Sequence, residues 1–144
     1  MTEIYQLGVK ALIRDRQGRI LLLQVDNSSF DDKSHGSYWD LPGGRVEKGD
    51  TIRQTLDREI DEELGAKIAG DPTEFAFSVA NIRIPWGEYK SGLILAIYEC
   101  QLDTSSTIKL SDEHIGYEWF APMDAADKLA IKFSGDFVAK LRTL

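Results

Sequence analysis

The sequence has a single cysteine, no long hydrophobic run and a shortage of basic residues, and each scarcity excludes something. Cys100 has no second cysteine with which to form an internal disulfide. No apolar segment approaches the ~20 residues that a membrane-spanning helix needs, which argues against a role inside a membrane. The Met-Thr-Glu start lacks the basic-then-apolar order of a secretory signal, so we expect a cytoplasmic protein.

Basic residues are outnumbered, with 17 lysines and arginines against 24 aspartates and glutamates and a net charge of −7. Non-specific binding to nucleic acid depends on lysine and arginine neutralising phosphates, so a nucleic acid polymer is not expected as a partner. A small phosphorylated ligand is compatible with this charge if a divalent cation lies between its phosphates and the protein's carboxylates.

The 144 residues, 42% of them hydrophobic and 28% charged, have the composition of an ordinary globular protein. This length suits one domain, so residues 1–144 are expected to form a single domain. The apolar runs 7–14 and 19–25, separated by a turn with Gly18, predict a β-hairpin. The polar stretch 26–37 predicts a surface loop.

Further strands are expected at 74–84, 89–102 and 117–120, with a turn at 85–87. Pro122 can open a short helix through about residue 129, and a second apolar stripe between residues 133 and 141 predicts another helix. Strands with interspersed helices in one short chain favour an α/β or α+β layered sandwich, although their order does not fix the strand pairing.

An amphipathic helix is predicted between Asp50 and Leu64, because Ile52, Leu56 and Ile60 recur at every fourth position. Asp50 and Thr51 are both suitable N-cap residues, and Gly65 stands where a helix commonly ends.

Glu59, Glu62 and Glu63 lie on one face of this predicted helix, because their spacing is i, i+3 and i+4. Like charges held together raise one another's pKa, so such a cluster usually needs a cation, and magnesium favours oxygen ligands. The alternative is a solvated surface helix, in which Arg58 and Lys67 are among the ion-pair partners. The spacing alone leaves both interpretations open.

The segment from Gly44 to Ala66, GRVEKGDTIRQTLDREIDEELGA, resembles the Nudix box, G-x5-E-x7-R-E-U-x-E-E-x-G-U with U aliphatic. The positions that match are Gly44, Arg58, Glu59, Ile60, Glu62, Glu63 and Gly65. Asp50 stands where the family has glutamate, and Ala66 is smaller than the usual final residue, whereas the central R-E-U-x-E-E is intact. The preceding Leu-Pro-Gly-Gly, residues 41–44, is also typical of the family.

This resemblance to the Nudix (MutT-like) hydrolases implies an α/β/α sandwich with a mixed β-sheet. It implies a hydrolase that acts on phosphoric anhydride bonds, cutting a diphosphate linkage in a nucleoside diphosphate derivative. The expected substrate is a nucleoside triphosphate, cut to a monophosphate and pyrophosphate. The expected cofactor is Mg²⁺, with Mn²⁺ as a substitute.

The resemblance also implies roles for individual residues. Glu59, Glu62 and Glu63 are expected to ligate the metal, with the backbone of Gly44 close to it. Arg58 is expected to support catalysis by orienting Glu59 or Glu62. Asp50 is interpreted mainly as a helix cap.

The general base is not fixed by the box. The candidates downstream are Glu113, before His114, and Glu118, before Trp119, each as a base or a metal ligand. Glu62 or Glu63 is an alternative base.

Other chemistry-bearing residues carry weaker predictions. Cys100 and Phe77 are expected in the core, while Trp39 and Trp86 are equally compatible with the core and with stacking on a nucleobase. Lys10 and Arg83 could each reach a phosphate from neighbouring strands.

Other functions stay open at this point. Within the family, dinucleoside polyphosphates, ADP-ribose and nucleotide sugars are alternative substrates, although Pro85 is not convincingly placed as an ADP-ribose signature. Outside hydrolysis, the alternatives are a non-catalytic nucleotide-sensing module and an isomerase of the isopentenyl diphosphate type, which needs a cysteine in its site. The oligomeric state, monomer or homodimer, is not determined by the sequence.

Overall fold

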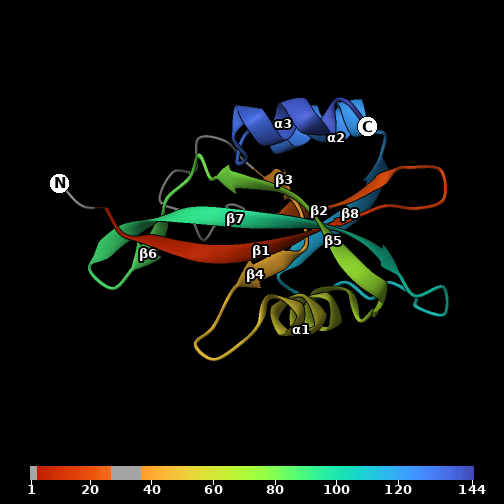
Figure 1. Ribbon diagram of the computed structural model, residues 1–144, viewed down its shortest axis with the longest axis horizontal. Coiled ribbons are helices and arrows are strands. Elements are labelled where there is room, and N and C mark those ends of the chain that lie inside the picture. Colours follow the sequence, from red (N-terminus) through yellow and green to blue (C-terminus); the bar gives the residue numbers. More distant parts are fainter. Residues whose placement is uncertain (1–2, 27–36) are drawn as a thin grey trace.

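The computed structural model describes residues 3–26 and 37–144, so most of the predicted surface loop at 26–37 lies outside the described residues. Two β-sheets lie between α1 on one side and α2 with α3 on the other (Figure 1). The strands are β1 (Tyr5–Ile13), β2 (Ile20–Val25), β3 (Tyr38–Asp40), β4 (Gly43–Arg45), β5 (Ile68–Val79), β6 (Ile84–Trp86), β7 (Tyr89–Leu102) and β8 (His114–Phe120). The helices are α1 (Ile52–Leu64), α2 (Pro122–Leu129) and α3 (Gly135–Leu141).

The larger sheet has the order β4-β1-β7-β5, with β6 paired to β7, and the smaller sheet has the order β3-β2-β8. β1 runs parallel to β7, whereas the other pairs are antiparallel, so the larger sheet is mixed. The two sheets part between β1 and β2, and the short strands β3 and β4 lie in different sheets although only two residues separate them.

The core has two clusters, which follow from the alternation of side chains along the strands. One cluster packs strand residues such as Leu12 and Leu95 against the buried faces of α2 and α3. The other packs Val9 and Leu21 against Leu56 and the rest of the apolar stripe of α1. Helices thus cover both sides of the strands, and the predicted α/β/α sandwich with a mixed sheet is confirmed. Among the helices described, none is long and apolar enough to cross a membrane.

The predicted hairpin of the first two strands is wrong in its pairing. The turn forms, with Gly18 at a positive φ of 77° and its amide 3.0 Å from the Asp15 carbonyl oxygen. Beyond a single bridge between Arg14 and Ile20, β1 and β2 diverge into separate sheets. Both strands contain runs in which every residue is buried, which is typical of strands covered on both faces.

Several boundaries in the second half also differ from the prediction, and the strand expected at 74–84 ends at Val79. β5 begins at Ile68 because Gly70 adopts a positive φ of 68° at an irregularity of this edge strand, so the strand continues through a Gly-Asp-Pro sequence that suggests a break. Trp86 belongs to β6 rather than to the turn, and β8 begins at His114. The two C-terminal helices occupy the predicted stretches.

Candidate active site

Helix α1 begins at a capping box. The Gln54 amide donates to the Thr51 hydroxyl at 3.1 Å, and the Thr51 amide donates to the Gln54 side chain at 2.8 Å. The interpretation of Asp50 as the cap is therefore wrong, because its carboxylate instead accepts a hydrogen bond from Arg58. Gly65 ends the helix in the left-handed conformation, as predicted.

The three glutamates of the box differ in exposure. Glu63 is 6% exposed, Glu59 is half-buried and Glu62 is exposed to solvent. The Glu63 carboxylate accepts a hydrogen bond of 2.7 Å from the Gly43 amide, which holds it against the turn between β3 and β4. The helix therefore presents its carboxylates across the boundary between the core and solvent, as its position beside the apolar stripe predicts.

Gly43 and Gly44 are required by close approach. Gly43 has a φ of 147°, and a Cβ built there would lie 2.0 Å from the Val9 carbonyl oxygen. A Cβ on Gly44 would lie 2.4 Å from Oε1 of Glu59. The Glu59 carboxylate thus occupies the space that a side chain at Gly44 would fill, and the backbone of the turn lies directly beside two carboxylates.

Burial raises the pKa of the Glu63 carboxyl to about 7, with Lys10 and the Gly43 amide opposing the change. Burial also raises the pKa of Glu59, and the neighbouring charge of Glu62 adds to it, with a smaller contribution from Glu113. Two carboxyl groups are thus held where ionisation is costly unless positive charge is close.

A divalent metal fits these residues in donor chemistry. The donors are carboxylate and backbone oxygens, which Mg²⁺ prefers. Among the described residues, the buried Ser111 hydroxyl and Nδ1 of His114 have no hydrogen-bond partner, and the His114 ring lies beside the Glu63 carboxylate, so polar capacity remains there. Within residues 3–26 and 37–144, however, no three His, Cys, Asp or Glu side chains converge on one point, so ligation by all three glutamates stays a prediction.

The segment before β8 is fixed to the end of α1. The Lys109 amide donates to the Leu64 carbonyl oxygen at 2.7 Å, and the Ser111 amide donates to the Glu63 carbonyl oxygen at 3.0 Å. This anchoring places Glu113 close enough to affect the pKa of Glu59. Nε2 of His114 lies 3.4 Å from Glu63, and burial lowers the pKa of this histidine, which favours its neutral form.

Glu118 and Arg58 are placed differently from each other. Glu118 is exposed on β8 opposite Leu22, with its side chain on the other face of the strand from Trp119. Arg58 binds Asp50, and its Nη2 lies 4.0 Å from Oε1 of Glu59, so its role in orienting that carboxylate stays a prediction.

The predictions for the other candidate residues have different outcomes. Cys100 is buried in β7, where burial raises its pKa to about 12, and its predicted packing role is confirmed. Phe77 is 66% exposed, so its predicted place in the core is wrong. Trp39 packs edge-to-face on Phe120, whereas Trp86 is 45% exposed. Arg83 pairs with Glu3 rather than facing the site.

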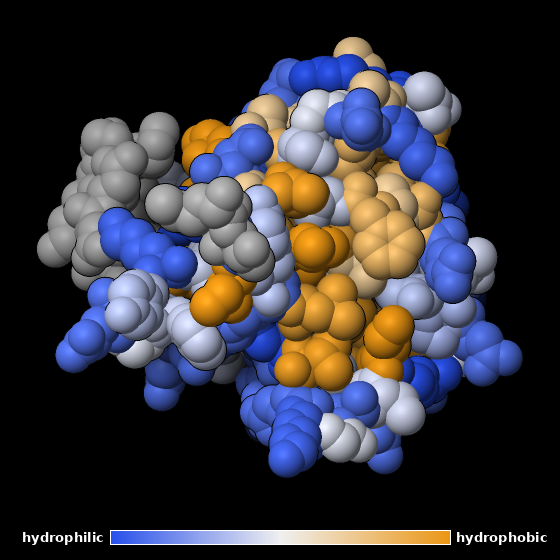
Figure 2. Space-filling model, turned by 60° about the vertical axis from the view of Figure 1, so that its left-hand side comes forward, coloured by the Kyte–Doolittle hydropathy of each residue, from blue (hydrophilic) through white to orange (hydrophobic). Residues whose placement is uncertain are grey.

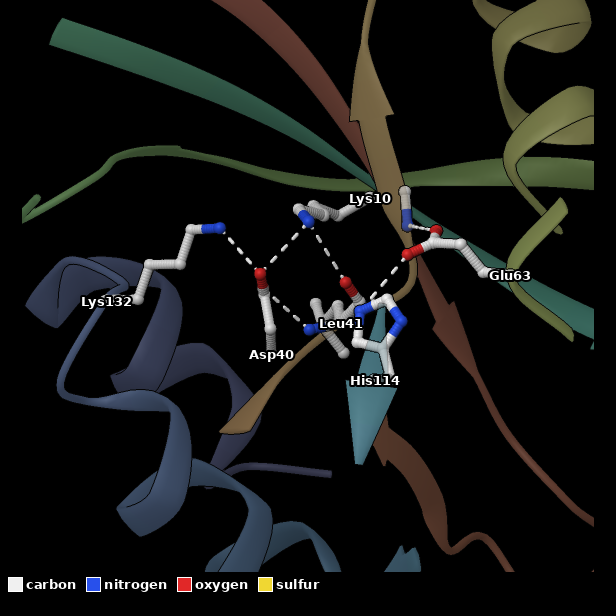
Figure 3. Close-up of polar contacts among 7 residues, drawn as sticks. Lys10, Asp40, Leu41, Glu63, His114 and Lys132 are labelled. Atoms are coloured by element: carbon white, nitrogen blue, oxygen red, sulfur yellow. Dashed lines mark hydrogen bonds and ion pairs between the residues drawn. The ribbon is translucent and has the colours of Figure 1, made fainter. Parts of the chain in front are cut away.

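A buried chain of charges was missed by sequence reasoning. Nζ of Lys132 lies 2.6 Å from Asp40, and Nζ of Lys10 lies 3.2 Å from the same carboxylate oxygen and 3.1 Å from the Leu41 carbonyl oxygen (Figure 3). Burial lowers the pKa of Lys132 to about 8, although Asp40 opposes it. Asp40 and Lys132 stand 92 positions apart in the chain, so no local pattern could have paired them.

A pocket of about 340 Å³ opens beside this chain of charges. Gly44, Lys10 and Lys132 all line it, so the pocket continues from the turn that faces Glu59. Figure 2 looks onto the end of the molecule that carries β6, where apolar residues gather in a band bordered by hydrophilic ones. The pocket and the Glu59 carboxylate thus both adjoin Gly44, on the edge strand β4 of the larger sheet.

The chain is similar to known proteins over most of its length. A family model described as the NUDIX domain matches residues 4–141. A nucleoside triphosphatase NudI from Salmonella heidelberg is 36% identical over 122 residues, which cover 80% of this chain and 81% of that protein. A MutT protein from Methanosarcina mazei superposes with a TM-score of 0.68 at 25% identity, covering 99% of this chain and 96% of the other. A MutT Nudix hydrolase from Burkholderia pseudomallei gives 0.66 at 23% identity, covering 99% of both chains.

Proposed function

This chain belongs to the Nudix hydrolases, enzymes that act on phosphoric anhydride bonds, and from that premise we propose that it converts a nucleoside triphosphate to a monophosphate and pyrophosphate with Mg²⁺. The observation that carries the proposal is the buried Glu63 carboxylate, held by the Gly43 amide, with Glu59 against Gly44, which also lines a pocket. The NudI relative, a nucleoside triphosphatase by name, supports the choice of substrate class.

Glu59, Glu62 and Glu63, with the backbone of Gly44, are the groups that would hold the metal. When bound, Mg²⁺ neutralises the charge of the phosphates and lowers the pKa of a coordinated water. The Gly43 amide fixes the direction of the Glu63 carboxylate, and the Arg58 guanidinium places a positive charge 4.0 Å from Glu59. This positioning is what phosphoryl transfer mainly demands from a protein.

Glu113 is our preferred general base. It is exposed, it lies close enough to affect the pKa of Glu59, and its segment is anchored to the end of α1. In that place its carboxylate can accept the proton of the attacking water. Trp119 packs against the core cluster that α1 covers, and Glu118 faces the other side of β8, which makes it the weaker candidate for base or ligand.

Two alternatives from other classes lose support. An isomerase that relies on a cysteine would need an accessible thiol at the site, whereas Cys100 is buried in β7. A sensing module without catalysis would not need three carboxylates, and α1 carries all three, with Glu59 and Glu63 beside the glycine turn. Among hydrolases, dinucleoside polyphosphates, ADP-ribose and nucleotide sugars are the substrates to compare.

The test is a panel of nucleoside triphosphates and these other diphosphates, incubated with and without Mg²⁺ and resolved by chromatography. We expect metal-dependent release of monophosphate and pyrophosphate, with large losses in Glu62→Gln and Glu63→Gln. Asp61→Asn is the matched control, because Asp61 is exposed on the same helix and has no proposed role. Cleavage of another compound alone would replace the triphosphate proposal, and full activity in Glu63→Gln would contradict the assigned site.

A further inference from the structure

The pocket beside Gly44 combines an apolar lining with positively charged side chains. Its apolar part is formed by Ile84, Pro85, Leu93 and Leu95 from β6 and β7. Its volume of about 340 Å³ lies at the lower end of the range for small-molecule pockets. The charged phosphate groups of a nucleotide would gain little binding free energy from an apolar lining. A flat heterocyclic ring, by contrast, would bury its faces against it.

All the charged side chains that line this pocket in the described part of the chain are cations, namely Lys10, Arg45 and Lys132. Lys132 is 6% exposed, and among the residues that the structure describes the one acceptor bonded to its ammonium group is Asp40. An ammonium group carries three N–H donors, so Lys132 has donors to spare at the pocket wall. Lys10 is more fully used, since it bonds both Asp40 and the Leu41 carbonyl oxygen.

Lys132 is also held in place by its backbone. The Asn81 amide donates to the Lys132 carbonyl oxygen at 2.7 Å, and the Asn81 side chain donates to the Phe133 carbonyl oxygen at 2.9 Å. The Ser134 amide donates to the Ser78 hydroxyl at 2.9 Å. The segment between α2 and α3 is thus fastened to the end of β5, and the ammonium group is positioned before any ligand arrives.

On the basis of the proposed function, we infer that this pocket receives the nucleobase and that Lys132 donates a hydrogen bond to a carbonyl oxygen of that base. The phosphates would then extend past Gly44 toward Glu59, because Gly44 lines the pocket and adjoins that carboxylate. Bases that turn a carbonyl group toward Lys132, at this edge of the ring, are favoured. An amino group there would bring N–H donors against a cation that can only donate.

The test compares substrate pairs that differ at this edge, UTP with CTP and ITP with ATP, by kcat/KM. A hydrogen bond from a charged donor corresponds to a preference of about tenfold or more for the carbonyl member of at least one pair. In Lys132→Met this preference should fall close to parity, while both members are still cleaved. Asp40 keeps its bonds from Lys10 and from the Leu41 amide in this variant, so the fold should persist.

Lys128→Met is the matched control, because Lys128 lies on α2 over the Phe120 ring and does not line the pocket, and it should keep the wild-type preference. Calorimetric affinities of non-hydrolysable UTP and CTP analogues give a second readout. A wild-type enzyme with no carbonyl preference, or Lys132→Met with an unchanged one, overturns the inference. If the UTP analogue binds more tightly than the CTP analogue, this difference depends on Lys132 and no triphosphate is cleaved, the proposed function is wrong. The assignment of the pocket to the base would still hold.

Discussion

The buried Glu63 carboxyl should make the metal-free protein less stable as the pH rises. Its pKa is raised from 4.5 to about 7, so between these values the folded state holds a proton that the unfolded chain has released. The contribution of Glu63 to stability is therefore greatest below pH 4.5 and decreases as the pH rises toward 7. At about 1.4 kcal/mol per pH unit, the interval corresponds to about 3 kcal/mol.

Glu63→Gln removes this effect, because glutamine resembles the protonated carboxyl and its oxygen can still accept from the Gly43 amide. In EDTA the variant should match the wild type near pH 5 and be more stable at pH 8 by up to about 3 kcal/mol, or about 6–12 °C in melting temperature. The measurement is thermal unfolding by circular dichroism across this pH range, with Asp61→Asn as the control.

Added Mg²⁺ should reverse the order, since it stabilises the wild type through its binding free energy and has less affinity for the variant. Parallel pH profiles for the wild type and Glu63→Gln in EDTA would refute the reasoning, because the cost of ionising Glu63 would then be absent. Equal stabilisation of both proteins by Mg²⁺ would refute the assignment of Glu63 as a ligand.

Three further predictions follow from the packing of the site and the core. Gly44→Ala places a Cβ 2.4 Å from Oε1 of Glu59, so kcat should fall by about tenfold or more while the fold persists, as steady-state kinetics and circular dichroism can check. Phe137→Ala empties a fully buried site and should cost about 3–5 kcal/mol in urea unfolding; a loss below 1 kcal/mol would contradict its place in the core. Thr51→Ala removes the hydroxyl that accepts from Gln54 and should cost about 1 kcal/mol in the same assay, with no large change in KM.

The sequence was most informative where the determinants are local. The bounds of α1 were predictable because Thr51, the apolar stripe and Gly65 all lie within one short segment. The turn at Gly18 was equally clear, since glycine supplies its positive φ. The pairing of β1 was not predictable, because its partners β4 and β7 are chosen by tertiary packing, and a turn signal does not require the strands beside it to pair along their length.

The missed features are those that depend on distant contacts. Phe77 has the apolar character of a core residue, but β5 is an edge strand and turns this side chain outward. Lys10 was singled out, yet its partners Asp40 and Lys132 come from a short strand and from the segment between two helices. Neither Asp40 nor Lys132 has a neighbour in the sequence that would distinguish it from a charged residue on the surface.

Residues 109–111 are hydrogen-bonded to the last turn of α1, so we expect the end of the helix and this segment to open as one cooperative unit. The Leu64 and Glu63 carbonyl oxygens, which a helix end usually leaves to water, accept from the Lys109 and Ser111 amides. Loosening the end of the helix therefore breaks these two bonds as well, so the two amides should exchange their hydrogens as slowly as the helix interior. A ligand that orders or loosens the end of α1 should therefore do the same to the segment that begins 45 positions later in the chain.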